Sequence, residues 1–237
     1  MLKKIIALTA SAGLLFAAAA QANEAEVKKA VEAVLGKNAK VDSVKKAGVL
    51  GLYEVVVGGE IAYADESASY LIFGNIVDVK ARRDLTDERK AKLAQIKFSD
   101  LPLDQAIKQV RGNGKRVIAT FEDPNCGYCK KLAKELVNMN DVTIYTFLYP
   151  ILSPDSLEKS KAIWCAADKA KSWNDWMVGG SAPAAAKCDA SAVDKTVALG
   201  QKLNIRGTPT IFFTDGSRAP GYMPVAQLEK AIAAAGN

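Results

Sequence analysis

The sequence contains no histidine among its 237 residues. A Ser-His-Asp or Cys-His catalytic system and any histidine-ligated metal site are therefore excluded. Aromatic residues make up only 7% of the chain, which leaves few rings for a surface that stacks nucleic-acid bases. With 49% hydrophobic and 24% charged residues, the composition also excludes a disordered, collagen-like or coiled-coil protein. The length suits one large domain or two small ones.

Residues 1–22 (MLKKIIALTASAGLLFAAAAQA) have the pattern of a secretory signal peptide. A basic start is followed by an apolar stretch and by an A-x-A cleavage site that ends at Ala22. Cleavage there leaves 237 − 22 = 215 residues, and the loss of two lysines lowers the net charge from +6 to +4. The apolar stretch is short for a membrane span, and none of spanning length follows it. We expect a soluble, exported protein.

Residues 23–83 carry nine basic and nine acidic residues and no cysteine. Apolar residues at positions i, i+3, i+4 and i+7 predict an amphipathic helix over 24–35. Two strand-like runs around Gly58-Gly59 predict a hairpin, and a second pair of strands is expected around Gly74-Asn75. These patterns predict a small α+β domain without chemistry of its own, which we expect to associate with a partner surface.

Residues 84–100 predict a polar helix that links two domains, with Thr86 as a candidate N-cap. The second domain, 101–237, is expected to contain a βαβ unit and an antiparallel pair of strands that completes the sheet. The tryptophans at 164, 173 and 176 are expected to pack in a helical insertion. The expected elements are helices over 103–110, 130–138 and 225–235, strands over 116–121, 142–150 and 209–213, and a mostly helical stretch over 155–203.

Cys126 and Cys129 form a CxxC motif at the start of the second of these helices. A thiolate is the nucleophile in disulfide exchange, and a helix N-terminus with Lys130 and Lys131 nearby favours the thiolate form. We therefore expect Cys126 to be the nucleophile and Cys129, one helical turn further on, to resolve mixed disulfides. The alternative is a purely structural disulfide between the two, although so short a loop gains little stability.

The other two cysteines, Cys165 and Cys188, lie 36 and 59 residues beyond Cys129. A zinc ribbon needs a second closely spaced pair of cysteines, and no histidine can replace it, so we expect no metal site. Four cysteines allow three pairings, and the CxxC motif favours 126–129 with 165–188 in an oxidising compartment. In the chain-entropy model the second disulfide would contribute about 3 kcal/mol.

The order of these features resembles the thioredoxin fold, with Thr208-Pro209 standing before the antiparallel pair. FEDPNCGYCKKL (121–132), NIRGTPTIFF (204–213) and DGSRAPGYMP (215–224) are similar to the DsbC/DsbG family of bacterial periplasmic thiol:disulfide isomerases. The resemblance implies an α/β thioredoxin fold with a helical insertion as the catalytic domain. It also implies that a small α+β (cystatin-like) dimerisation domain and a linker helix precede this fold.

The resemblance assigns roles to residues around the CxxC motif. It implies that Gly127 and Tyr128 form the active-site dipeptide, and that Thr208 and a cis-Pro209 support an extended substrate. It implies a structural role for the 165–188 disulfide. Family members are homodimers that are kept reduced by a membrane-bound donor of the DsbD type, and they use no soluble cofactor. The sequence contains no glycine-rich phosphate loop, which agrees with this expectation.

The chain departs from thioredoxin at one position. Thioredoxin has a buried aspartate six residues before its first cysteine, where this chain has Thr120. Glu122 and Asp123 could replace that carboxylate, but we expect both to be solvated loop charges.

The function that we expect is a periplasmic disulfide isomerase with chaperone activity, acting on misfolded or wrongly disulfide-bonded exported proteins. The first alternative is a different redox role, either a dithiol oxidase or a DsbG-like reductase that guards single cysteines. The second is a dimeric chaperone whose thiols are incidental. Nucleic-acid binding is not expected, because a net charge of +4 without a basic run gives no patch for phosphates.

Overall fold

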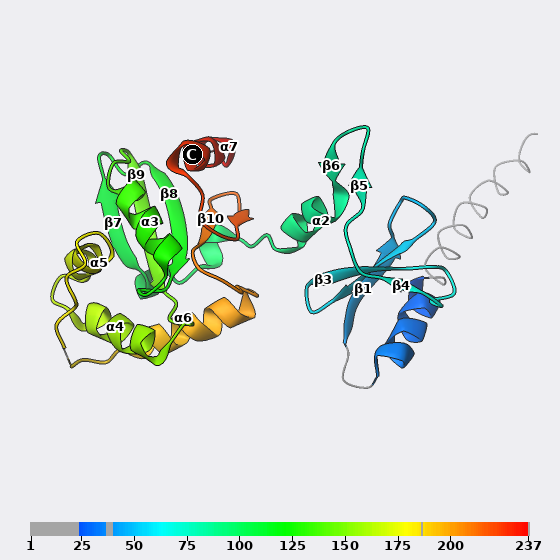
Figure 1. Cartoon of the computed structure of the whole chain (residues 1–237), viewed down its shortest axis with the longest axis horizontal. Coiled ribbons are helices and arrows are strands. Elements are labelled where there is room, and N and C mark those ends of the chain that lie inside the picture. The colour runs from blue at the N-terminus through cyan, green and yellow to red at the C-terminus, as the bar shows by residue number, and fades with distance from the viewer. Residues whose placement is uncertain (1–23, 37–39, 186, 237) are drawn as a thin grey trace, which may run out of the picture. The chain divides into compact units, whose positions relative to one another are not determined.

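The computed structural model describes residues 24–36, 40–185 and 187–236, so the predicted signal peptide lies outside the described residues. The chain folds as two compact units that divide between Leu93 and Ala94 (Figure 1). This division lies inside the stretch 84–100 that the sequence predicts to be a linker. Within the described ranges, no helix is both long enough and apolar enough to cross a membrane.

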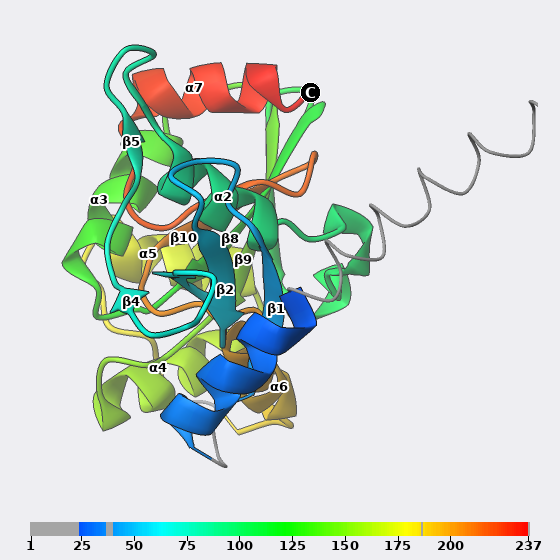
Figure 2. The same cartoon turned by 90° about the vertical axis from the view of Figure 1, so that its right-hand side faces the viewer.

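The first unit combines a helix over residues 24–35 with a four-stranded antiparallel sheet in the order β1-β2-β3-β4. The predicted helix is confirmed: Val27 and Val31 are buried against the sheet, and Figure 2 shows the helix beside β1. The hairpin around Gly58-Gly59 is also confirmed, since both glycines have positive φ in the turn that joins β2 to β3. The strands are β1 (Val41–Lys46), β2 (Tyr53–Val57), β3 (Glu60–Ala64) and β4 (Leu71–Ile72).

The second predicted hairpin, around Gly74-Asn75, is wrong. β4 pairs with β3, whereas β5 (Val77–Asp78) pairs with β6 (Arg83–Asp84) in a separate two-stranded sheet. The cause lies in hydrogen bonds to the next helix. Asn75 Nδ2 donates to carboxylates at positions 84 and 87, and Ile76 N donates to Thr86 Oγ1, so the chain leaves β4 instead of turning back on it.

The helix predicted in the linker is present as α2 (Leu85–Leu93). Its cap differs from the prediction, because Asp84 Oδ1 accepts from Asp87 N at 2.9 Å and so occupies the capping position. Thr86 is fully buried two residues further on, and its hydroxyl lies 2.6 Å from Tyr63 Oη of β3. Thr86 therefore packs the helix onto the first sheet and does not cap it.

The second unit is built on a five-stranded sheet in the order β11-β10-β8-β9-β7. β8 and β9 are parallel and are joined by helix α3, so the predicted βαβ unit is confirmed, as is the antiparallel pair of β10 and β11. β8 lies in the middle of the sheet, so both of its edges are paired, one with β10 and the other with β9. The strands are β7 (Ile107–Arg111), β8 (Arg116–Glu122), β9 (Val142–Leu148), β10 (Thr210–Phe213) and β11 (Arg218–Ala219).

The helix predicted over 103–110 is wrong. Only a 3₁₀ turn, η2 (Leu103–Gln105), forms there, and β7 follows as an edge strand that pairs with β9 from Ile107 opposite Thr146 to Arg111 opposite Val142. The open edge of β9 offers unpaired backbone groups, and pairing with them outweighs the local preference of this segment. A second 3₁₀ turn, η1 (Phe98–Asp100), precedes it.

Helices cover both faces of this sheet (Figure 1). α3 and α7 pack on one face around Ile118, Ile144 and Ile211, and α6 packs on the other beside Phe121 and Phe212. The helical insertion and the closing helix are confirmed. The helices are α3 (Gly127–Leu136), α4 (Pro154–Cys165), α5 (Lys169–Met177), α6 (Ser191–Lys202) and α7 (Val225–Ala234).

Candidate functional site: a buried dithiol at a helix N-terminus

Cys126 is the N-cap residue of α3. Its backbone is extended (φ −73°, ψ 121°), and the amide N–H of Cys129 donates to its Sγ at 3.3 Å. In its protonated form the Cys126 thiol donates to the carbonyl oxygen of Thr208 at 3.3 Å. Both cysteines of the motif are reduced and buried in the structure, Cys129 completely so. The first sulfur thus lies at the unpaired amides of the helix start, where negative charge is stabilised.

The pKa values of the two thiols are shifted in opposite directions. The pKa of Cys126 falls from the usual 9.0 to about 5, chiefly because the Cys129 side chain hydrogen-bonds to it; Thr208 and backbone amides add to this, against the cost of burial. Burial raises the pKa of Cys129 far above its usual value, and the hydrogen bond with Cys126 raises it further. At neutral pH the site therefore contains one thiolate, at Cys126, and one protonated thiol.

Thr208 and Pro209 lie beside the cysteines because β10 pairs with β8 and the segment before β10 reaches the start of α3. The Thr208–Pro209 peptide bond is cis. Pro209 is buried and Thr208 half-buried, and Thr210 Oγ1 fixes the turn by donating to Gly207 O at 2.9 Å. The structure thus brings this segment together with the CxxC motif, although 82 residues separate Cys126 and Thr208.

Gly127 and Tyr128 lie on the surface beside the thiolate. The Tyr128 side chain is 65% exposed and stacks on Tyr222, with 6.1 Å between the ring centroids. Lys131 Nζ lies 4.4 Å from the centre of the Tyr222 ring, and Glu135 accepts the hydrogen bond of the Tyr222 hydroxyl. An aromatic surface, held in place by Lys131 and Glu135, therefore lies next to the reactive sulfur. Tyr222 was not predicted as a site residue.

The expectation that Asp123 is a solvated loop charge is wrong. Asp123 is fully buried, and its carboxylate accepts hydrogen bonds from the backbone amides of Asn125, Ile151 and Leu152 at 2.8, 2.8 and 2.9 Å. It therefore ties the CxxC loop to the segment that follows β9.

The same expectation is wrong for Glu122. This side chain is 1% exposed at the end of β8, and burial raises its pKa from 4.5 to about 8, against a hydrogen bond from Thr120. Negative charge at Cys126 also raises the pKa of Glu122, and charge at Glu122 raises that of Cys129. A carboxyl group is thus coupled to both thiols.

Two further side chains hold the loop that precedes Cys126. Asn125 Nδ2 donates to Asp155 Oδ2 at 2.6 Å at the start of α4. Trp176 Nε1 donates to the carbonyl oxygen of Pro124 at 2.6 Å, and Lys130 Nζ lies 4.0 Å from the centre of the Trp176 ring. Sequence analysis assigned Trp176 only to packing, because nothing in the sequence shows that α5 reaches this loop.

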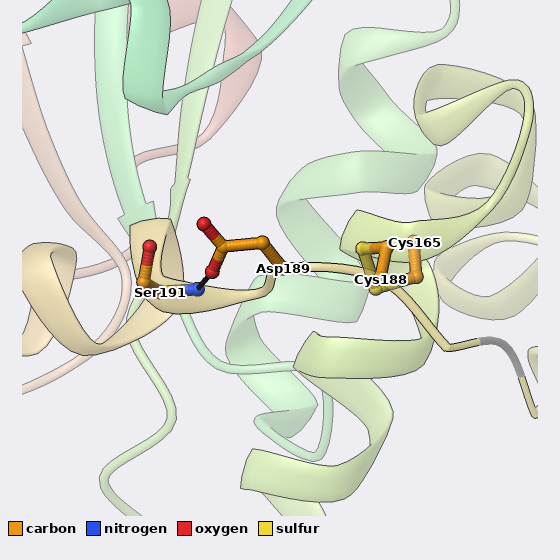
Figure 3. Close-up of a disulfide and its surroundings, with 4 residues drawn as sticks. All are labelled: Cys165, Cys188, Asp189 and Ser191. Carbon is orange, nitrogen blue, oxygen red and sulfur yellow. Dashed lines mark hydrogen bonds between the residues drawn. A yellow bond between two sulfur atoms is a disulfide. The ribbon is translucent and has the colours of Figure 1, made fainter.

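A disulfide joins Cys165 at the end of α4 to Cys188, with 5.5 Å between their Cα atoms (Figure 3). Next to it, Asp189 Oδ1 accepts from Ser191 N at 2.9 Å, which fixes the start of α6. The disulfide links the end of α4 to the segment before α6. Both of its cysteines are distant in sequence from the reduced pair. Among the residues that the structure describes, no cluster of three or more Cys, Asp or Glu side chains could hold a metal ion.

Two family models match this chain. A thioredoxin-like domain matches residues 103–236, and the disulfide bond isomerase protein N-terminal domain matches residues 18–87. The "Probable thiol:disulfide interchange protein DsbC" of Bordetella pertussis is 54% identical over 76% of this chain and 64% of its own length. The "Thiol:disulfide interchange protein DsbC" of Escherichia coli is 31% identical over 91% of this chain and 89% of its own.

A solved structure supports the same relationship. The disulfide interchange protein from Neisseria gonorrhoeae is 45% identical, covers 56% of this chain and 97% of its own, and superposes with a TM-score of 0.55. The match covers 64% of the length of the Bordetella relative, which is slightly less than two thirds. The two matching domains and the relative from E. coli, which is matched over nearly its whole length, place this chain in the DsbC family of thiol:disulfide interchange proteins.

Proposed function

We propose that this chain is a periplasmic protein disulfide isomerase that acts with Cys126 and Cys129. The observation that carries the proposal is the asymmetry of the dithiol, with Cys126 at a helix N-cap and a pKa of about 5 and Cys129 buried behind it. A thiolate at neutral pH can attack a client disulfide, and a protonated partner leaves the resulting mixed disulfide time to rearrange.

The reaction follows from these positions. The Cys126 thiolate attacks one sulfur of a wrong client disulfide, and the other client sulfur leaves as a thiolate. A client thiolate then attacks the mixed disulfide, forms a new client disulfide and restores the Cys126 thiolate, so no net oxidation or reduction occurs. Should no client thiol do so, Cys129 attacks Cys126 and releases the client reduced. The oxidised pair must then be reduced, and we infer a membrane donor of the DsbD type.

Clients are expected to bind beside the thiolate. The backbone at Thr208 and Pro209 offers an edge for an extended chain, and the stacked Tyr128 and Tyr222 rings offer an apolar surface. These contacts are independent of client sequence, which suits an enzyme that acts on many misfolded exported proteins. The roles of Gly127, Thr208 and Pro209 in this binding are part of the proposal.

The first unit is proposed to join two copies of the chain. β4 is an edge strand of its sheet, and it is flanked by exposed apolar side chains at Tyr70, Ile72 and Phe73. A pocket of about 220 Å³ opens beside it, lined by residues that include Val31, Leu71 and Phe73. An exposed apolar edge invites pairing with another strand. The match to the isomerase N-terminal domain supports a second copy as that partner.

The decisive experiment supplies the prereduced full chain in catalytic amounts to a client with scrambled disulfides. Recovery of client activity is expected, and it should be lost in Cys126→Ser. Cys129→Ser should retain part of the activity and accumulate mixed disulfide, because it cannot release a client that fails to rearrange.

The low pKa of Cys126 also supports a second candidate, a dithiol oxidase, because stabilising the reduced form makes the disulfide form more oxidising. Rapid oxidation of a reduced client by the disulfide form, without recovery of a scrambled one, would favour this candidate. If neither reaction occurs but aggregation of an unfolded client is suppressed, the chain is a chaperone and the proposal fails.

A further inference from the structure

Tyr128, Lys131 and Glu135 lie on one face of α3, because spacings of three and four residues bring side chains above one another along a helix. Tyr128 is the second residue of the helix, and the thiolate at Cys126 occupies its N-cap. The Tyr128 side chain is 65% exposed. A ring this exposed buries little area of its own, so its position depends on a neighbouring side chain.

That neighbour is Tyr222, which comes from the segment between β11 and α7. Its ring stacks with Tyr128, with 6.1 Å between the centroids and 29° between the ring planes. Lys131 Nζ lies 4.4 Å from the centre of the Tyr222 ring, and the Tyr222 hydroxyl donates to Glu135. Tyr222 also packs, half-buried, against the core cluster beneath α3 and α7. Tyr222 is thus fixed by α3 and the core, and it restricts Tyr128.

The Glu135 carboxylate anchors this arrangement with both of its oxygens. Oε1 accepts from Tyr222 Oη, and Oε2 accepts from the backbone amide of Val225, the first residue of α7, at 2.8 Å. These hydrogen bonds lower the pKa of Glu135 below its usual 4.5, whereas that of Cys126 is about 5. The carboxylate is therefore ionised wherever Cys126 is a thiolate, and Tyr222 stays anchored over that whole pH range.

A fixed Tyr128 ring affects how a client binds. The sulfur of a client must reach Cys126, so the client residues beside that sulfur come to lie next to Tyr128. Immobilising a free side chain during association costs free energy, and a ring that is already held avoids this cost. Aromatic rings interact best with other aromatic or apolar groups in defined geometries. The stack therefore favours clients with such a group beside the reacting cysteine.

We propose that Tyr222 is a positioning residue that holds Tyr128 in place to bind an aromatic or apolar client side chain beside the reacting client cysteine. The inference rests on the proposed thiol–disulfide exchange and adds to it the class of client segment that the site prefers. Tyr222 acts through Tyr128 and leaves the chemistry of Cys126 unchanged, because its ring contacts and its hydrogen bond are with α3 side chains other than the cysteines.

Two short peptides test the inference, each with one cysteine joined by a disulfide to thionitrobenzoate. One peptide has phenylalanine beside the cysteine and the other has serine. The Cys126 thiolate attacks the peptide sulfur, the original disulfide bond breaks, and thionitrobenzoate leaves as a coloured thiolate. Stopped-flow measurement with the reduced full chain at increasing peptide concentration gives the maximal rate and the half-saturating concentration separately.

For the phenylalanine peptide, Tyr222→Leu should raise the half-saturating concentration about 5-fold and leave the maximal rate unchanged. This variant removes the ring but keeps an apolar side chain against the core. Tyr222→Phe keeps the ring and should stay within about 2-fold of the wild type. The serine peptide should react alike with all of these proteins. Val110→Ala, at an exposed apolar residue of the same unit, is the control and should match the wild type with both peptides.

A double-mutant cycle tests whether Tyr222 acts through Tyr128. Tyr128→Ala should raise the half-saturating concentration for the phenylalanine peptide at least as far as Tyr222→Leu does. Combining the two substitutions should raise it no further, because no ring is left to be held. Multiplied effects in the double variant would overturn the inference, as would an unchanged half-saturating concentration in Tyr222→Leu.

The pH profile of Cys126 alkylation separates positioning from an effect on the thiol. The profile should be the same in the wild type, Tyr222→Leu and Tyr222→Phe. A profile displaced in Tyr222→Leu would show that Tyr222 acts on the thiol itself, and the inference would be wrong. Failure of the proposed function has a different signature, namely a wild type that releases thionitrobenzoate from both peptides but does not recover a scrambled client.

Discussion

Single residues around the dithiol show how position changes chemistry. Cys126 and Cys129 are the same residue type three positions apart, yet the pKa of the first is lowered and that of the second is raised. The Cys129 side chain and, after it, the amides of the helix start stabilise the charged form of Cys126, and burial penalises the charged form of Cys129. Glu122 and Asp123 are both buried carboxyls, but only Asp123 has backbone amides on both oxygens.

The pKa of Cys126 gives a prediction for pH dependence. The rate of alkylation by iodoacetamide should be constant above about pH 6 and fall about 10-fold per pH unit below pH 5. A lowered pKa stabilises the folded state above the unfolded pKa of 9.0, and this contribution is lost as pH falls through 5. The free energy of unfolding of the reduced protein, relative to Cys126→Ser, should therefore increase from pH 5 to pH 9. A flat difference would contradict the assignment.

Asp123 gives a prediction for stability. Asp123→Ala removes a fully buried carboxylate and leaves three backbone amides without their acceptor, so the free energy of unfolding of the second unit should fall by about 3 kcal/mol. Urea unfolding followed by tryptophan fluorescence reports this unit alone, since all three tryptophans lie in it. Asp104→Ala, at an exposed carboxylate of the same unit, is the control and should cost less than 1 kcal/mol by the usual range for surface changes.

Secondary-structure elements match the sequence patterns where local residues set the conformation. They depart from these patterns where contacts with a distant segment set it. The strands β8 and β9 and the helix α3 form where their apolar patterns predict them. The segment 107–111 becomes a strand only because β9 has a free edge, and the strands after Gly74 separate because α2 binds the intervening chain. Edge pairing and side-chain hydrogen bonds between distant segments have no local signature.

The disulfide between α4 and the segment before α6 gives a prediction at this scale. Replacing Cys165 and Cys188 together by alanine should lower the free energy of unfolding of the second unit by about 3 kcal/mol, because a loop of this length is no longer closed in the unfolded chain. The alkylation rate of Cys126 should not change. A loss of Cys126 reactivity would show that the bridge supports the active site as well.

The second unit contains the reduced dithiol, and the first unit contains no cysteine. The first unit presents an apolar edge at β4, and the second presents a thiolate beside an aromatic surface. If two copies join through β4, the dimer has two thiolate sites. One client can then bind at both sites at once, which a monomer with a single site does not allow.

The dimer is tested by a charge at the β4 edge. Ile72→Lys should convert the protein to a monomer in analytical ultracentrifugation, because a lysine at an edge strand opposes pairing. Cys126 alkylation should be unchanged, while recovery of a scrambled client should fall several-fold. Val77→Lys, at an apolar residue of similar exposure outside β4, is the matched control. A dimer that persists in Ile72→Lys would refute β4 as the interface.

Local patterns along the chain were enough to predict the βαβ unit, the CxxC at a helix start, the Thr-Pro segment before an antiparallel pair and the N-terminal α+β unit. These follow from short-range periodicity and turn residues, which act within a few positions of the chain. The packing of distant segments buries Glu122 and Asp123, brings Trp176 and Asp155 to the active-site loop, and stacks Tyr222 on Tyr128. Burial of a charge depends on which elements cover it, and that is decided when distant segments pack together.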